Sequence, residues 1–281
     1  MHRTNKTYGE ITKLIFATDL DQTLIFSEKH ITNELKDRVV PAETKNGSII
    51  TYMLHETLDK IKSLRDKLIL IPTTTRTLEQ YERINIFRSC VSPKFAVVNH
   101  GGSVLIDGVP DKNWDKCIQD KLSVGCEPLV NILDKFKSQL YHENWILDIR
   151  QVESFFFYCI VNIDTTPMTE LSDFMKEIEA YNWYSCLHGR KLYFLPKSLN
   201  KWNAIEYIKD MLPNKQVVSS GDSYMDFELL FMADYAILPS HGEICNKFKP
   251  SNKCIITNSK GIEASLEILH IVEKIYNSDY K

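Results

Sequence analysis

Short apolar runs of strand length alternate with segments of helical period along most of the chain. Residues 13–18 and 68–71 are mainly apolar, and between them Leu58, Ile61 and Leu64 recur at the spacing of one helix face. The same alternation continues with helical patterns at Leu78, Tyr81, Ile84 and Phe87, at Ile205, Ile208 and Leu212, and at Ile262, Leu266, Leu269, Val272 and Ile275, and with strand-like runs at residues 95–98 and 216–219. Such alternation is typical of parallel strands joined by crossover helices, and apolar runs indicate a sheet covered on both faces. The sequence therefore predicts an α/β fold built on a parallel sheet.

Two stretches interrupt this alternation. In residues 38–53, two β-rich runs flank Asn46 and Gly47, a dipeptide that favours a tight hairpin turn, so we expect a hairpin flap after the first strand. Residues 111–190 hold two adjacent strands between two helices, a pattern typical of a small α+β unit, and about 80 residues suffice for a domain. The predicted domains are a core of residues 1–110 and 191–281 and an inserted α/β domain of residues 111–190.

Composition excludes several classes of protein. Hydrophobic residues make up 43% and charged residues 25%, as in globular proteins rather than disordered or collagen-like ones. The longest apolar run, residues 155–161, is far shorter than the roughly 20 residues of a membrane-spanning helix, and the segment with Asn5, Lys6 and Thr7 lacks the apolar stretch of a secretory signal. A net charge of -3 gives no general attraction to nucleic acid or anionic membranes. We therefore expect a cytoplasmic protein that binds neither nucleic acid nor membranes. Its seven scattered cysteines are expected to be reduced thiols. The sequence does not indicate an oligomeric state.

Two carboxylates follow the first apolar run directly. Asp19 and Asp21 are two residues apart, so in extended chain their side chains point the same way. Open parallel sheets bind ligands beyond the carboxyl ends of their strands, and two like charges held together need a cation or a shared proton. Mg²⁺ fits such a pair, whereas a solvated turn with two acids is the alternative for this segment alone.

A second acidic segment follows the apolar run at residues 216–219. Gly221 permits a tight turn, and Asp222 could complete a metal site with the first acid pair. Asp226 lies one helical turn further on and could be another ligand or an acceptor outside the metal's coordination sphere. A helix cap at Asp222 or Ser223 is the alternative.

Two further segments suit a phosphate. The hydroxyls of residues 73–75 precede a helix, where backbone N–H groups favour an anion, although a threonine cap explains them equally well. Lys201, after Asn200, begins a helical stretch, where a cation opposes the helix dipole. An anion beside Lys201 would account for its position, and an ordinary surface lysine is the alternative.

Taken together and in this order, the four segments resemble the motifs of the haloacid dehalogenase (HAD) superfamily of phosphatases. Residues 19–23 are similar to the first motif, with Gln22 where many members have glycine. Thr74 falls on the threonine or serine of the second motif, and Arg76 on the basic residue often found two positions later. The remaining matches are Lys201 for the third motif and residues 221–223 with Asp226 for the fourth.

Residues 99–102 resemble the Asn-Gly turn of the Cof-like branch of this superfamily, to which sucrose-phosphatases, mannosyl-3-phosphoglycerate phosphatases and phosphomannomutases are similar. In that branch a large α/β cap is inserted between the second and third motifs, where residues 111–190 lie. The resemblance covers residues 13–108 and 192–256. It implies a Rossmann-like core and a cap that closes over the site and contacts the leaving group.

The resemblance also implies a mechanism. Asp19 would be the nucleophile that forms an aspartyl-phosphate, and Asp21 the acid that protonates the leaving oxygen and then the base that activates water. Mg²⁺ would be held by Asp19, Asp222 and the backbone carbonyl of Asp21, with Asp226 nearby. The dehalogenases and P-type ATPases of the superfamily lack an acid at the position of Asp21, so its presence favours phosphate-ester chemistry.

By the same resemblance, Thr74 and Lys201 would hold the phosphoryl oxygens. Arg150 is expected in the turn between two strands of the insert, and Arg190 where the insert returns to the core. The expected substrate-binding residues are Arg76, Asn99 and Asn200 from the core and Arg150 and Arg190 from the insert.

The predicted function is that of a Mg²⁺-dependent phosphatase acting on a small phosphorylated metabolite such as a sugar phosphate. A phosphomutase of the phosphomannomutase type is an alternative, because it forms the same intermediate but returns the phosphate to a sugar. A non-catalytic sensor of a phosphorylated ligand is a second alternative, which the full set of catalytic residue types disfavours.

Overall fold

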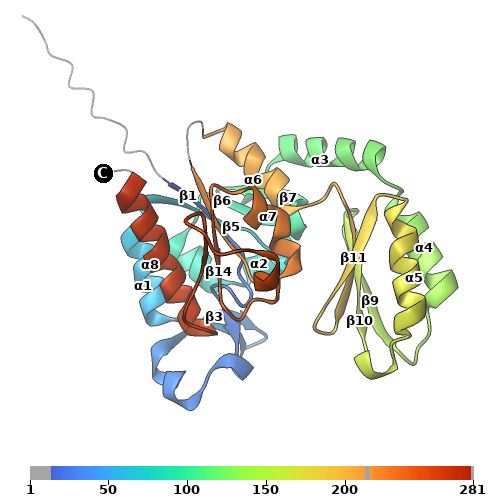
Figure 1. The fold of residues 1–281 in the computed structure, drawn as a ribbon, viewed down its shortest axis with the longest axis horizontal. Helices are drawn as coiled ribbons and strands as arrows, with labels where there is room; N and C mark the ends of the chain where they lie inside the picture. Colours follow the sequence, from blue (N-terminus) through green and yellow to red (C-terminus); the bar gives the residue numbers. More distant parts are fainter. Residues whose placement is uncertain (1–13, 213–215, 280–281) are drawn as a thin grey trace, which may run out of the picture.

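The computed structural model describes residues 14–212 and 216–279. Lys13, the expected start of the first strand, and the segment with Asn5, Lys6 and Thr7 lie outside the described residues. A five-stranded parallel sheet in the order β15-β14-β13-β1-β5 forms the centre of the larger unit (Figure 1). Its strands are β1 (Leu14–Thr18), β5 (Leu68–Pro72), β13 (Val217–Ser220), β14 (Tyr235–Leu238) and β15 (Cys254–Ile256). The predicted parallel α/β core is confirmed.

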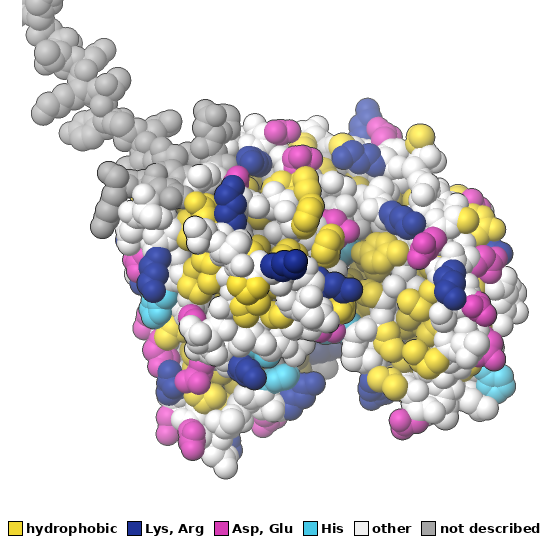
Figure 2. Space-filling view, viewed as in Figure 1, with side chains coloured by type: hydrophobic (Ala, Val, Ile, Leu, Met, Phe, Trp, Pro, Cys, Tyr) yellow, Lys and Arg dark blue, Asp and Glu magenta, His cyan; other side chains and the backbone are white. Residues whose placement is uncertain are grey.

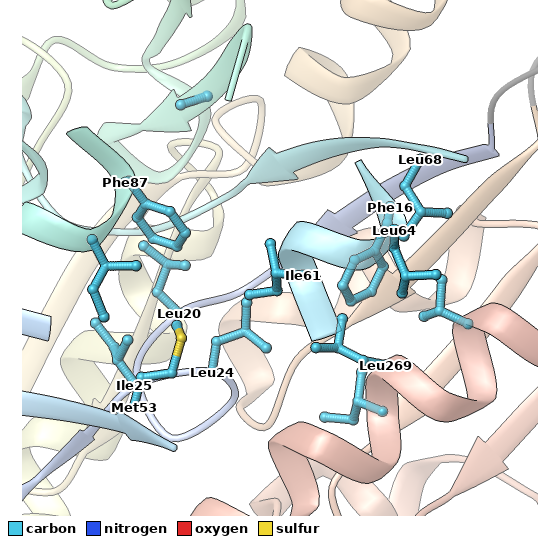
Figure 3. Packing of buried hydrophobic residues seen from close by; sticks show 14 of the residues in the cluster. Phe16, Leu20, Leu24, Ile25, Met53, Ile61, Leu64, Leu68, Phe87 and Leu269 are labelled. Carbon is cyan, nitrogen blue, oxygen red and sulfur yellow. The ribbon is translucent and has the colours of Figure 1, made fainter. Parts of the chain in front are cut away.

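Helices cover both faces of this sheet. Successive residues of β1 face opposite sides, and all five of them are buried, so the sheet has an apolar surface on each face. Phe16 packs with Leu64 and Leu269 on one face (Figure 3), and Ile15 packs with Ile205 on the other. The helices of this unit are α1 (His55–Leu64), α2 (Leu78–Glu82), α3 (Lys112–Gly125), α6 (Lys201–Asp210), α7 (Phe227–Met232) and α8 (Ile262–Asp279). Among the described residues, no helix combines the length and the apolar character needed to cross a membrane.

The segment after α2 differs from the predicted alternation. The helix ends at Glu82 rather than continuing to Phe87, which begins a separate π-helical turn, Phe87–Val91. Residues 95–98 form a strand as expected, but that strand belongs to a separate antiparallel sheet of β6 (Phe95–Val98), β7 (Ser103–Ile106) and β8 (Val109–Pro110). A single parallel bridge between Thr73 and Val97 connects this sheet to the chain beyond β5.

The expected hairpin flap is present. It consists of β3 (Val39–Lys45) and β4 (Ser48–Leu54), which pair antiparallel, with β2 (Phe26–Ser27) on the other edge of β4. Asn46 and Gly47 both have positive φ, 51° and 78°, as a tight hairpin turn requires. Short 3-10 turns lie at Glu28–His30, Asn33–Arg38, Asn99–Gly101, Ile163–Thr165, Tyr224–Asp226 and Glu243–Lys247.

The smaller unit is a four-stranded antiparallel sheet with two helices packed on one face (Figure 1). Phe136, Phe157, Phe174 and Phe194 meet in the core between the sheet and these helices. The elements, with strand order β11-β12-β10-β9, are α4 (Leu129–Leu140), β9 (Ile146–Val152), β10 (Phe156–Val161), α5 (Met168–Glu179), β11 (Trp183–His188) and β12 (Lys191–Pro196). We call this unit the cap.

The elements of the cap do not coincide with the expected insert of residues 111–190. Strand β12 follows Arg190, yet it lies between β10 and β11 in the cap sheet. Helix α3 falls inside the expected insert, but its Trp114 is buried in one cluster with Ile15 of the central sheet, and its indole donates to the Gly101 carbonyl. We therefore propose cap boundaries near Cys126 and Pro196.

Candidate active site

The register of the central sheet brings the sequence-predicted segments to one edge. Thr18, the last residue of β1, pairs with Ser220 of β13 and with Pro72 of β5, so the residues after these three strands are neighbours. A cavity of about 770 Å³ opens at this edge between the core and the cap, where the molecular surface is indented (Figure 2). Asp19, Asp21 and Asp222 line it.

Lys201 connects two buried carboxylates in the wall of this cavity. Its side chain is 2% exposed, and its Nζ lies 2.5 Å from Oδ1 of Asp19 and 2.5 Å from Oδ1 of Asp226. Lys201 is the first residue of α6, and the Oδ1 of Asn200 accepts the N–H of Asn203 and caps this helix. Two carboxylates of the chain thus lie beside the lysine, and a phosphate at this position stays a prediction. Asn200, expected to bind substrate, is a helix cap that does not line the cavity.

Three carboxylates gather here around a single ammonium group. One oxygen each from Asp19, Asp222 and Asp226 lies within 4.8 Å of the others. Burial raises the pKa of Asp19 to about 7 against the opposing charge of Lys201. Burial, together with the charges of Asp19 and Asp226, raises the pKa of Asp222 well above its ordinary range. Additional positive charge beyond that of Lys201 would therefore favour the ionised forms of Asp19 and Asp222. Carboxylate oxygens of this kind are ligands that Mg²⁺ prefers.

The three acids differ in how far protein donors occupy them. The second oxygen of Asp226 accepts the N–H and the hydroxyl of Ser223, at 3.0 and 2.9 Å, so both of its oxygens have donors. Gly221 makes this arrangement possible, because a Cβ there would lie 2.5 Å from the Cβ of Asp226. Asp19 and Asp222 are therefore the better candidates for metal ligands, and Asp226 holds Lys201. The Asp21 side chain is not part of this group.

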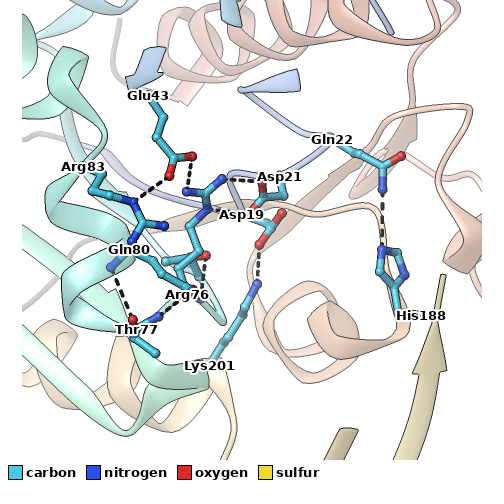
Figure 4. Close-up of polar contacts among 11 residues, drawn as sticks. Asp19, Asp21, Gln22, Glu43, Arg76, Thr77, Gln80, Arg83, His188 and Lys201 are labelled. Carbon is cyan, nitrogen blue, oxygen red and sulfur yellow. Dashed lines mark hydrogen bonds and ion pairs between the residues drawn. The ribbon is translucent and has the colours of Figure 1, made fainter. Parts of the chain in front are cut away.

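Asp21 lies against a guanidinium instead. The Nε and an Nη of Arg76 donate to its two oxygens at 2.7 and 2.8 Å (Figure 4). The partial burial of Asp21 alone would raise its pKa, but the hydrogen bonds and charge of Arg76 outweigh this effect and lower the pKa. The other Nη of Arg76 donates to Glu43 at 2.6 Å. Arg76 lines the cavity, but two carboxylates occupy its donors, which does not favour the expected substrate contact.

Thr74 and Thr75, which follow β5, have different surroundings. Thr74 is fully buried after β5, and its Oγ1 accepts the backbone N–H of Arg76 at 3.1 Å. Thr75 lines the cavity, whereas Thr74 does not. The structure thus places Thr74 where it shapes the turn that carries Arg76.

Asn99 does not line the cavity. It has a positive φ of 54°, and its Nδ2 donates to Ser103 Oγ at 3.2 Å and to Glu153 Oε1 at 3.0 Å. Because Glu153 belongs to the β9–β10 turn, Asn99 joins the core to the cap. The expectation that Asn99 binds substrate is not supported by this position.

Several cap side chains line the cavity opposite the acids. Arg150 lies within β9, not in the turn where it was expected, and its Nε donates to Asp148 at 2.6 Å. Arg190 lies between β11 and β12, at a hairpin turn rather than at the return to the core. The cavity-lining residues that the sequence analysis did not select include Glu43, Arg83, Tyr158, Lys191 and Tyr193, and His188 of the cap lines the cavity as well.

One of these residues contacts the first motif. His188 Nε2 lies 3.5 Å from Nε2 of Gln22 (Figure 4). The Nδ1 of His188 lies 3.3 Å from Oε1 of Glu243. Gln22 has a positive φ of 59°, a conformation that favours glycine, and this explains the glycine that the resemblance leads one to expect there. The β11–β12 hairpin of the cap and the loop after β1 are therefore in contact.

The model of the family Sucrose-6F-phosphate phosphohydrolase matches residues 12–243. The chain belongs to this family. It is accordingly a phosphoric monoester hydrolase of the HAD superfamily. A search of the curated proteins finds no match.

Three of the solved structures that are similar to this family member are the following hydrolases. The sucrose-phosphatase of Synechocystis sp. PCC6803, solved with sucrose and phosphate, has 13% identity and a TM-score of 0.67 over 93% of this chain and 98% of that one. The HAD subclass IIB sugar phosphatase BT4131 has 11% identity and a TM-score of 0.62 over 94% and 100%. The haloacid dehalogenase-like protein yhjK of Bacillus subtilis has 16% identity and a TM-score of 0.57 over 95% and 93%. These similarities confirm the HAD fold.

Proposed function

We propose that this enzyme is a Mg²⁺-dependent phosphatase that hydrolyses a small phosphorylated metabolite, such as a sugar phosphate, through an aspartyl-phosphate on Asp19. The observation that carries the proposal is the position of the Asp19 carboxylate. It follows β1 directly, 2.5 Å from Lys201 Nζ, in a cavity that cationic residues of the cap also line. This is the setting in which a carboxylate can attack an anionic phosphorus centre.

In the first step, a carboxylate oxygen of Asp19 attacks phosphorus, and the bond to the ester oxygen breaks. Asp21 gives its proton to that leaving oxygen. Lys201 faces the same carboxylate and stabilises charge on the phosphoryl oxygens during transfer. Thr75 lines the cavity after β5, whereas the buried Thr74 lies outside the cavity lining and holds the turn that carries Arg76.

In the second step, the ionised Asp21 takes a proton from water, and the water oxygen attacks phosphorus. The Asp19–phosphate bond breaks, releasing inorganic phosphate and restoring the carboxylate. The contact with Arg76 lowers the pKa of Asp21 and so favours the ionised form that this second step requires. In the first step Asp21 must take up a proton before it can give one to the leaving oxygen.

The acid group fits the cofactor of this reaction. When bound by Asp19, Asp222 and the Asp21 backbone carbonyl, Mg²⁺ would neutralise the repulsion between the nucleophile and the phosphate. Asp226 would keep Lys201 in place, since each of its oxygens accepts a hydrogen bond from the chain.

The cavity supports a sugar phosphate as the substrate class. Its volume of about 770 Å³ lies in the usual range for small-molecule sites, about 300–1,000 Å³. Arg150, Arg190 and Lys191 face it from the cap and can donate hydrogen bonds to hydroxyl or anionic groups of the leaving sugar. The family description, which names sucrose 6F-phosphate, makes that compound the first candidate to assay.

A direct assay tests the proposal. Purified protein is incubated with sucrose 6-phosphate, hexose phosphates and an aryl phosphate, with Mg²⁺ or with excess chelator, and inorganic phosphate is measured. We expect phosphate release that requires Mg²⁺. Interconversion of hexose phosphates in the presence of a sugar bisphosphate, without phosphate release, would identify a phosphomutase instead. Phosphate release in excess chelator would contradict the metal requirement.

A further inference from the structure

A buried carboxylate that the proposed mechanism does not use lies beside the site. The side chain of Glu43, in strand β3 of the hairpin flap, is 1% exposed. Its two oxygens accept from two guanidiniums, from Nη1 of Arg76 at 2.6 Å and from Nε of Arg83 at 3.0 Å (Figure 4). Burying a charge is costly unless it is paired in this way, so the position of Glu43 needs an explanation beyond packing.

The flap is irregular where it carries this residue. The pairing of β3 with β4 shifts register on both sides of Glu43, between Pro41 and Glu43 and between Glu43 and Thr44. Ala42 and Glu43 are both buried, although consecutive residues of a regular strand face opposite sides. A bulge of this kind re-aims a side chain, and here it turns Glu43 towards Arg76. A bridge between Glu43 and Ile84 also fastens the strand to the chain after α2.

Arg76 contacts both Glu43 and the loop that carries Asp21. Its remaining donors hold both oxygens of Asp21, at 2.7 and 2.8 Å. The Asp21 side chain is 48% exposed, so packing does not immobilise it, and within the described ranges 14–212 and 216–279 no other side chain donates to it. Because Glu43 holds one Nη of Arg76, the orientation of the planar guanidinium is fixed. Its Nε and other Nη then determine the orientation of the Asp21 carboxylate.

We propose that Glu43 is a positioning residue of the phosphatase reaction, which fixes Arg76 and through it orients the acid–base carboxylate of Asp21. The inference rests on the function proposed above, since Asp21 matters for its proton transfers. Those transfers slow when Asp21 is free to rotate. The attack of Asp19 on a substrate with a good leaving group needs no proton from Asp21 and does not depend on Glu43.

The half-reactions of p-nitrophenyl phosphate hydrolysis separate these two effects. In rapid-quench measurements with Mg²⁺, we expect Glu43→Gln to release the first equivalent of nitrophenol at the wild-type rate. Later turnover should slow about 10- to 100-fold, as for a weakened acid–base group. Glu79→Gln is the matched control, because Glu79 pairs with the same Arg83 but is 83% exposed, and it should leave both phases unchanged.

A second variant and a double variant complete the test. Arg76→Lys keeps the charge but loses the fork, and we expect it to reproduce the two-phase behaviour even if Glu43→Gln does not fold. In an Asp21→Asn background, Glu43→Gln should cause no further slowing, because no acid–base group remains to be oriented. Equal slowing of both phases in folded Glu43→Gln, or a further loss in that background, would overturn the inference. Absence of a first-equivalent phase in the Asp21→Asn protein itself would instead overturn the proposed function.

Discussion

Lys201 Nζ lies 2.5 Å from Oδ1 of Asp19, although the two residues are 182 positions apart in the chain. They meet because α6 begins beside the edge of the sheet where β1 ends. Burial alone would lower the pKa of Lys201, but the charges of Asp19 and Asp226 outweigh it and raise that pKa. The ammonium is therefore charged whenever the acids around it are ionised, and it can stabilise the phosphoryl oxygens.

Lys201→Met should be damaging in two ways. We expect kcat to fall by about 10²–10³, because one donor to the transferring phosphoryl group is lost. The free energy of unfolding should fall by about 3–5 kcal/mol at neutral pH, since two buried carboxylates lose their cation. Urea unfolding and steady-state kinetics measure the two effects. Lys209→Met, in the last turn of the same helix, is the control, and an equal loss there would contradict the role of Lys201.

Metal binding should depend on pH in a defined direction. Burial raises the pKa of Asp19 to about 7, so the folded protein holds a proton that an unfolded chain releases near pH 4. Metal-free protein should therefore lose stability as the pH rises from about 4 to 7, and Mg²⁺ should raise Tm more at about pH 8 than at about pH 5. Thermal melts with Mg²⁺ and with chelator measure this difference. An equal Tm shift at both pH values would be inconsistent with metal binding by these acids.

Asp222→Ala should remove most of that Mg²⁺-dependent stabilisation, because it deletes a carboxylate to which no donor within residues 14–212 and 216–279 is hydrogen-bonded. It should also raise the Mg²⁺ concentration needed for activity or abolish activity. Asp226→Asn should have a milder effect on the Mg²⁺ requirement, since Asp226 holds Lys201 and Ser223. Titration of activity with Mg²⁺ compares the two variants, and a greater Mg²⁺ requirement in Asp226→Asn would reverse the assignment.

Arg190→Ala should change the choice of substrate. In the proposed mechanism the core binds the phosphoryl group that all substrates share, so discrimination requires contacts to the leaving group. We expect kcat/KM to fall about tenfold or more for a sugar phosphate and to stay unchanged for a small aryl phosphate. Arg150→Ala should have a smaller effect, because Asp148 already occupies its guanidinium. Lys176→Ala on α5 is the control, and the same substrate ranking in all three variants would exclude the cap arginines from specificity.

The positions of Asp19, Asp222 and Lys201 beside the edge of the central sheet could be predicted from the sequence because strand ends and helix starts are local features. Asp19 follows an apolar run and Lys201 begins a helix, and residues in such positions are expected at the carboxyl edge of a parallel sheet. This expectation needs no knowledge of tertiary contacts. The partner of each side chain could not be predicted in the same way. Asn99 and Asn200 carry suitable polar groups, but one joins the core to the cap and the other caps α6.

Glu43 was missed for a related reason. In a regular hairpin an acid next to Ala42 faces solvent, and only the bulge, a tertiary feature, turns it inward. The strand after Arg190 did leave a signal, since Gly189 and Arg190 separate two β-rich runs as a two-residue hairpin loop does. The predicted turn at Arg150 is wrong, because β9 continues to Val152, beyond the expected end of the strand. Errors of this size at element boundaries arise because packing across the sheet, rather than local sequence, determines where a strand ends.

Trapping of the phosphorylated enzyme tests the mechanism most directly. Asp21→Asn protein, which keeps the nucleophile but lacks the base for hydrolysis, is mixed with substrate and Mg²⁺, quenched in acid and analysed by mass spectrometry. We expect the protein to gain the mass of one phosphoryl group, located on the peptide that contains Asp19, and we expect no gain in the Asp19→Asn, Asp21→Asn double variant. Phosphate release by folded Asp19→Asn protein at near wild-type rate, or a phosphoryl group on any other residue, would contradict nucleophilic attack by Asp19.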